Sequence, residues 1–133
     1  MKCTHPVAVT GLSKKVRCGK CIGCKVTKIN EWKIRILDEL SDHEKAVFLT
    51  LTYDNENLPP GKSLSKSDLQ KYIKRLRKDL SKDNRKIRHF SAGEYGDPAS
   101  MERGQIEGDR PHYHLIIFGV SPDEEEILQK NWK

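Results

Sequence analysis

The segment RPHYHLIIFG, at residues 110–119, constrains the fold more than any other part of this sequence. Its second half is an apolar run rich in β-branched and aromatic residues, which is typical of a strand buried in a sheet. Side chains alternate between the two faces of a strand, so His112 and His114 point to one face and Tyr113 to the other. The two histidine Cβ atoms then lie roughly 6–7 Å apart, close enough for both imidazoles to hold one cation. The segment therefore predicts a strand that begins with a pair of metal ligands.

A second predicted strand, over residues 86–95, adds an acidic side chain to this pair. It carries Glu94 near its end, and it precedes the histidine strand in the chain. If the two strands pair as an antiparallel hairpin, a register that sets Glu94 opposite His112 also sets Ala92 opposite His114. This register places one carboxylate beside two imidazoles on the same face of the sheet. It predicts a three-ligand metal site.

Two histidines and a carboxylate suit more than one metal ion, and the charge of the chain helps to choose between them. Such a site with open coordination positions suits Mg²⁺ or Mn²⁺, and the same trio also describes non-haem Fe(II) oxygenases. The net charge of +6 indicates a polyanionic partner, with nucleic acid ahead of a membrane surface. We therefore favour Mg²⁺ or Mn²⁺ and phosphodiester chemistry. The iron alternative needs an oxoacid-binding arginine, for which Arg110 is the close candidate, and a barrel too large for 133 residues.

The rest of the chain predicts helices and one more strand around this hairpin. Apolar residues recur at helical spacing in KVTKINEWKIRILDEL, and again in a segment that opens with the cap-like pair Ser65 and Asp68. The stretch AVFLTLTY is rich in β-branched and aromatic residues and predicts a strand. The expected helices are 25–40, 65–80 and the beginning of one at 123–132, the strands are 46–53, 86–95 and 111–119, and the loops are 55–63 and 96–110. This order predicts an α+β domain with an antiparallel sheet that is unfinished.

All four cysteines lie within the first 24 residues and form a second candidate metal site. Cys18, Cys21 and Cys24 have the spacing C-x₂-C-x₂-C, with Cys3 as the fourth ligand and His5 as a spare one. Thiolates at this spacing suit a tetrahedral structural Zn²⁺. An iron–sulfur cluster and four reduced thiols without metal are the alternatives. The pattern indicates a small Cys-rich knuckle ahead of the α+β domain.

The sequence also bears on compartment and surface. No apolar run approaches the roughly 18 residues of a membrane span, and the N-terminus lacks the apolar core of a signal peptide. We therefore expect a reducing cytosolic compartment, where clustered cysteines bind metal rather than pair as disulfides. A solvated helix face is the alternative explanation for the basic side chains of the second helix. The candidate DNA-binding residues are Lys20, Lys25, Lys71, Arg75, Lys78 and Arg110.

Three motifs in this order resemble a known family. They are FLTLTYDNENLP (48–59), GEYG (93–96) and RPHYHLIIFG (110–119), and they follow the cysteine cluster. Together they resemble the replication initiators of gokushovirus-type microviruses, including those of chlamydiae, within the endonucleases named for a His-hydrophobic-His (HUH) motif. The resemblance implies an HUH, RRM-like fold, with a Cys-rich knuckle at 1–25 and the N-terminal part of the endonuclease domain at 26–133.

The resemblance implies rolling-circle initiation in the cytoplasm of a bacterial host, on single-stranded DNA or an origin hairpin, with the host replication machinery as a further partner. In the family a tyrosine attacks a DNA phosphodiester and becomes linked to the 5′ phosphate. Its metal ligands correspond to His112 and His114, with Glu94 as the third. The family's nucleophile follows the histidine pair, whereas no tyrosine follows Tyr113 here.

We therefore expect the chain to be an initiator truncated before its nucleophile, so that its status as an enzyme stays open. Tyr53 and Tyr95 are the remaining candidates for the attacking residue. The alternative function is a non-catalytic, zinc-dependent DNA-binding module, or a remnant of an initiator.

Overall fold

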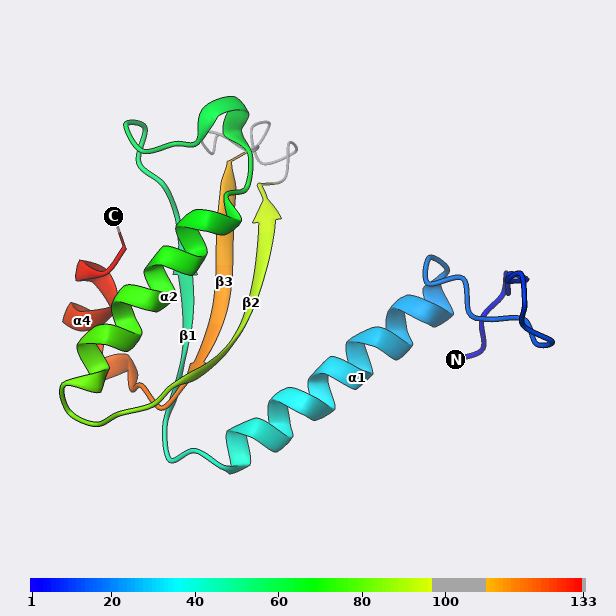
Figure 1. Ribbon diagram of the computed structural model, residues 1–133, viewed down its shortest axis with the longest axis horizontal. Coiled ribbons are helices and arrows are strands. Elements are labelled where there is room, and N and C mark those ends of the chain that lie inside the picture. The colour runs from blue at the N-terminus through cyan, green and yellow to red at the C-terminus, as the bar shows by residue number, and fades with distance from the viewer. Residues whose placement is uncertain (97–109, 133) are drawn as a thin grey trace. The chain divides into compact units, whose positions relative to one another are not determined.

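The computed structural model describes residues 1–96 and 110–132, and the chain forms two compact units (Figure 1). The first unit, Met1–Asp42, holds the cysteine segment and helix α1 (Ile22–Ser41). The second, His43–Lys133, holds the sheet and the other helices. Compactness thus divides the chain at the end of α1, while the domain boundary expected after residue 25 stays a prediction.

The second unit is built on a three-stranded antiparallel sheet of β1 (Ala46–Leu51), β2 (Arg88–Tyr95) and β3 (Pro111–Phe118). The strand order is β1-β3-β2, so the histidine strand is central and pairs on both sides. The two faces of β3 differ, because Tyr113, Leu115 and Ile117 are buried while the residues between them include the two histidines. The predicted α+β class with an antiparallel sheet is confirmed.

Helices α2 (Lys66–Ser81) and α4 (Glu125–Lys130) pack against the apolar face of the sheet. Figure 1 shows α2 running across the strands with α4 beside it. The core cluster joins Leu76 of α2 and Leu128 of α4 to Leu115 of β3. Because helices cover this face, the histidines lie on the opposite, open face of the sheet.

Local signals account for the ends of these elements. The Ser65 hydroxyl accepts a hydrogen bond from the Asp68 amide (3.3 Å), so the predicted cap of α2 is confirmed. Short 3₁₀ turns, Pro60–Lys62 and Pro122–Glu124, precede α2 and α4. The loop expected at 96–110 lies outside the described residues, apart from its two ends. There the Gly96 amide donates to the Arg110 carbonyl (3.1 Å), which extends the hairpin ladder by one step.

Helix α1 has the expected apolar spacing, but most of its apolar stripe is exposed. Gly23 and Cys24 are its buried residues, whereas Ile29 is 64% exposed and Leu37 is 53% exposed. Spacing sets which side chains share a helix face, whereas burial requires a packed neighbour. Within residues 1–96 and 110–132, no helix combines the length and the apolar character needed to cross a membrane.

Candidate metal sites

The first candidate site lies on the open face of the sheet and joins β2 to β3. In the observed register Glu94 faces His112 and Ala92 faces His114, which confirms the pairing predicted from the sequence. The ligand atoms of Glu94, His112 and His114 all lie within 4.8 Å of one another. The structure therefore brings the three predicted side chains together, from two neighbouring strands of a hydrogen-bonded ladder.

One carboxylate oxygen organises this group. Oε2 of Glu94 lies 2.9 Å from Nε2 of His114 and 3.5 Å from Nε2 of His112. The two imidazole rings stand nearly perpendicular, at 86°, with their centroids 4.9 Å apart. Both Nε2 atoms thus converge on the same oxygen, which is the arrangement that a shared cation requires.

The Nδ1 atoms of the two histidines explain how the rings are oriented. Nδ1 of His112 lies 3.2 Å from the carbonyl oxygen of Arg110, and a carbonyl can only accept, so Nδ1 carries the proton in this hydrogen bond. A neutral His112 then presents the lone pair of Nε2 to the Glu94 carboxylate. Two acceptors that face each other need a cation or a proton between them. Nδ1 of His114 is oriented by the Thr50 hydroxyl, at 3.1 Å.

The group is accessible to a large ligand. The Glu94 side chain is 61% exposed, and the two histidines are partly exposed. Beside them, the Phe48 ring stacks on the His114 ring with centroids 5.7 Å apart, and Phe48 is itself 66% exposed. Thr50 and Phe48 were not among the predicted site residues. Their alternation along β1 was the available signal, but it became useful only once the pairing with β3 was known.

All four tyrosines of the chain are among the described residues, and their hydroxyls are engaged away from this group. Tyr53 is buried, and its hydroxyl donates to Asp68 (2.9 Å); burial first, and then its hydrogen bond with Tyr113, raises its pKa well above the usual range. The Tyr95 hydroxyl accepts from the Leu64 amide (3.1 Å). Tyr113 points away from the histidines and Tyr72 lies in the core, as predicted.

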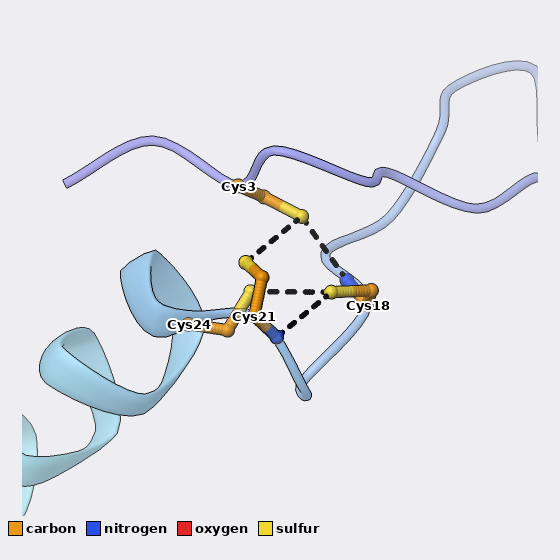
Figure 2. A group of neighbouring side chains, drawn as sticks. All are labelled: Cys3, Cys18, Cys21 and Cys24. Atoms are coloured by element: carbon orange, nitrogen blue, oxygen red, sulfur yellow. Dashed lines mark hydrogen bonds between the residues drawn. The ribbon is translucent and has the colours of Figure 1, made fainter.

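The second candidate site is the cysteine cluster near the N-terminus (Figure 2). Its four Sγ atoms lie within 4.8 Å of one another. The Sγ atoms of Cys18 and Cys24 are 3.9 Å apart, as are those of Cys3 and Cys21. Figure 2 shows all four side chains pointing toward a common centre, with Cys24 on the first turn of α1. The spare ligand His5 is not part of this group, within the chain as described.

Backbone amides favour thiolates in this cluster. The amides of Cys21 and then Lys20 donate to Sγ of Cys18 and lower its pKa. The amide of Thr4 and then that of Cys24 lower the pKa of the Cys21 thiol to about 5. Hydrogen bonds to the charged form stabilise it, and thiolate is the form that binds metal.

The candidate DNA-binding residues are spread over several surfaces. Lys71 and Lys78 are exposed on α2, which covers the face of the sheet opposite the histidines. Arg75 is partly buried, and its Nε donates to the Asn131 carbonyl (2.9 Å). The Arg110 guanidinium donates to Asn55 and to the carbonyl of Tyr53, near the end of the histidine strand. Lys20 and Lys25 are exposed beside the cysteines.

Comparison with known proteins agrees with the predicted resemblance. The sequence model of the replication-associated protein ORF2 family matches residues 46–133. The chain is 38% identical to the replication-associated protein VP4 of Bdellovibrio phage phiMH2K, over 80% of this chain and 32% of that protein. It is 33% identical to the replication-associated protein ORF4 of Chlamydia phage 1, over 84% of this chain and 26% of the relative.

A third relative, the replication-associated protein ORF2 of Spiroplasma virus 4, is 30% identical over 86% of this chain and 35% of its own length. The chain thus spans about a third of the length of these relatives. No solved structure matches it. The predicted resemblance to microvirus replication proteins is confirmed, and the chain belongs to the replication-associated protein ORF2 family.

Proposed function

We propose that this chain acts in the initiation of phage DNA replication by holding single-stranded DNA on a divalent metal ion for nicking. The observation that carries the proposal is the convergence of Glu94, His112 and His114 on the open face of the sheet. The family and the names of its phage relatives supply the biological setting. The net charge of +6 supports a polyanionic ligand.

The three side chains would hold Mg²⁺ or Mn²⁺ through two Nε2 atoms and one carboxylate. When bound, such an ion polarises a phosphate oxygen and orients the phosphodiester. The donor set fits, because the His112 and Glu94 acceptors face each other and need a cation between them. The Arg110 carbonyl and Thr50 hydroxyl orient the two rings through their Nδ1 atoms, as partners of metal-binding histidines commonly do.

The exposed Phe48 ring favours single-stranded DNA over duplex DNA at this face. Base–aromatic stacking contributes about 1–3 kcal/mol per base, and it requires an unpaired base. Phe48 lies beside His114, so a base stacked on it would bring the neighbouring phosphate toward the metal group. The open face of the sheet then serves as the DNA-binding platform.

Nicking in this family joins a tyrosine oxygen to phosphorus while the bond to the 3′ oxygen breaks and that oxygen takes up a proton. The hydroxyls of Tyr53 and Tyr95 are directed at Asp68 and the Leu64 amide rather than at the metal group. We therefore infer that the attacking tyrosine is not one of the four in this chain. By itself the chain binds metal and DNA without completing the covalent step.

Metal binding at the sheet site can be tested by titrating the protein with Mn²⁺ and following the free ion by electron paramagnetic resonance. We expect one Mn²⁺ at this site, and we expect His112→Ala, His114→Ala and Glu94→Gln to abolish its binding. His5→Ala is the matched histidine control and should bind as the unaltered chain does. Equal Mn²⁺ binding by the control and the three variants would refute the site.

DNA binding can be tested separately, by fluorescence anisotropy with a labelled single-stranded oligonucleotide. We expect Phe48→Ala to weaken binding by about tenfold or more, and Phe48→Trp to preserve it, because stacking depends on an aromatic face. Identical affinities for the two variants would exclude Phe48 from the interface.

A second candidate function is a DNA-binding module that does not cleave. The placement of the four tyrosine hydroxyls favours it for this chain taken alone. Such a module needs no cation at Glu94, His112 and His114. Retained DNA binding together with absent Mn²⁺ binding would select this candidate over the first.

A further inference from the structure

The N-terminal unit, Met1–Asp42, has no hydrophobic core of its own. Cys24 is its one buried hydrophobic side chain, and all residues of the unit are described. Val7 is 46% exposed and Leu12 is 58% exposed. Folded units of about 40 residues usually need disulfides, a metal ion or a partner to be stable. The four cysteines are free, so disulfides do not supply this stability.

Specific contacts nevertheless bring the distant Cys3 to the other cysteines. The backbone of Val7 pairs with that of Val16 through two hydrogen bonds of 2.9 Å, which closes the loop between Cys3 and Cys18. One terminal nitrogen of Arg17 lies within hydrogen-bond distance of the Met1 carbonyl, at 3.0 Å, and also of the Gly23 carbonyl and the Thr27 hydroxyl of α1. Arg17 therefore ties the N-terminal segment to the start of the helix.

Gly23 allows the same close approach. A Cβ at this position would lie 2.2 Å from the backbone oxygen of Lys2, a separation that the chain cannot accept without a backbone shift. Only a glycine lets the segment that carries Cys3 lie against the first turn of α1. Gly19 has φ of +73°, which lets the chain turn tightly between Cys18 and Cys21.

The spacing of the sulfur atoms is that of a tetrahedral zinc site. A Zn–S bond of about 2.3 Å places sulfur atoms about 3.8 Å apart at the corners of a tetrahedron. The Sγ–Sγ separations of Cys18–Cys24 and Cys3–Cys21 are both 3.9 Å. Backbone amides donate to the sulfurs as well, including that of Cys18 to Sγ of Cys3 at 3.4 Å. Such bonds orient metal-binding thiolates.

We propose that Cys3, Cys18, Cys21 and Cys24 bind one Zn²⁺ ion, and that this ion folds the unit Met1–Asp42 in place of a hydrophobic core. Four protein ligands close the coordination shell, which makes the site structural rather than catalytic. Binding displaces the protons that remain on the thiols, so zinc binding and folding of this unit are one coupled event. The proposal is independent of the sheet site, which shares none of these residues.

The first test is the metal content of the purified full chain, measured by atomic emission. We expect one zinc per chain, lost in Cys18→Ser and Cys24→Ser and retained in the double variant His112→Ala/His114→Ala. Replacement by Co²⁺ should produce the near-ultraviolet charge-transfer absorption of cobalt–thiolate bonds. Iron with bound sulfide, or a chain that is fully folded and metal-free, would overturn the proposal.

The second test asks whether the ion folds the unit. A zinc chelator should remove helical circular dichroism and open Met1–Asp42 to protease, while the fragment that starts near His43 stays resistant because it has its own core. Mass spectrometry of the digest locates the cuts. Unchanged protection of the first 42 residues after complete removal of zinc would contradict the coupling of binding to folding.

Gly23→Ala provides a variant in which every thiol is kept. Because its Cβ would collide with the backbone that carries Cys3, we expect zinc affinity to fall by about 10–100-fold, as for other changes that misplace a ligand. Asn30→Ala, at an exposed position on α1, is the matched helix control and should bind zinc normally. Competition with a chromophoric chelator measures both affinities. Equal values would show that Cys3 is not a ligand.

Discussion

At the residue scale, the sheet site depends on the atoms that hold each imidazole from behind. His112 is oriented by a backbone carbonyl, which no side-chain substitution removes, whereas His114 is oriented by the hydroxyl of Thr50. The two ligands therefore differ in how far mutation can disturb them. This difference lets the role of the Nδ1 contacts be measured separately from the role of the ligands.

Thr50→Val should weaken Mn²⁺ binding at the sheet site by about tenfold, because the His114 ring loses its hydrogen-bond partner. Valine has a similar shape and suits a strand, so the fold should be retained. Thr52→Val is the matched control, since its side chain is not among the contacts of either histidine. Isothermal titration calorimetry measures both affinities, and equal values would show that the hydroxyl does not position His114.

Residue-scale placement also explains why the two candidate nucleophiles could not be judged from sequence. Tyr95 follows Glu94 directly, so the alternation of a strand sends its side chain to the opposite face. Tyr53 lies just beyond β1, where alternation no longer applies, and its place in the core depends on Asp68 and Tyr113 from distant segments. Only the packed structure shows that both hydroxyls are engaged elsewhere.

At the scale of elements, the turn between β3 and α4 depends on one acidic residue. Glu124 accepts from the Arg85 guanidinium and from the Ser121 amide, at 2.8 Å, within a capping box. The hydrogen bond from Arg85 is the main cause that lowers the pKa of Glu124 to about 2, from its usual 4.5. Because this folded-state pKa is depressed, the stabilisation is fully present above pH 4.5 and is lost as the pH falls to about 2.

Glu124→Gln should therefore lower the free energy of unfolding by about 2 kcal/mol at pH 6, with a difference that shrinks toward zero as the pH approaches 2. Urea denaturation at pH 6, 4 and 2.5 measures the difference. Glu126→Gln, at an exposed position on α4, is the matched control and should change little at any of these pH values. A deficit of Glu124→Gln that stays constant between pH 6 and 2.5 would show that the ion pair is not its cause.

At the scale of the whole molecule, the two units are stabilised by different means. The sheet unit has a continuous core in which Leu76 and Leu115 are fully buried. The N-terminal unit has four clustered thiols and an exposed apolar helix face. Each unit also contains one of the two tryptophans, Trp32 in α1 and Trp132 beyond α4. Their fluorescence can therefore follow the two units separately.

Leu76→Ala should destabilise the sheet unit by about 2–5 kcal/mol, because it leaves a cavity beneath the sheet. Leu37→Ala, at an exposed position on α1, is the matched control and should change stability by no more than about 0.5 kcal/mol. Urea denaturation followed by Trp132 fluorescence, in a Trp32→Phe background, measures both. A large loss in the control, or none in Leu76→Ala, would contradict this assignment of the core.

The sequence by itself determined the α+β class, the elements of the hairpin and the pairing of Glu94 with His112, because alternation along a strand is a local property of period two. It also indicated the four-cysteine group, since three of its members lie within one turn and the start of a helix. These features need little information from distant parts of the chain.

Only the tertiary structure decided which surfaces are covered. It placed the lysines of α2 across the sheet from the histidines, brought Phe48 beside His114, and left the apolar stripe of α1 exposed. It also brought Cys3 to the other cysteines through the close approach at Gly23. The physical reason is the same in each case, because burial and contact depend on which distant segments pack together, whereas periodicity specifies only the face that a side chain occupies.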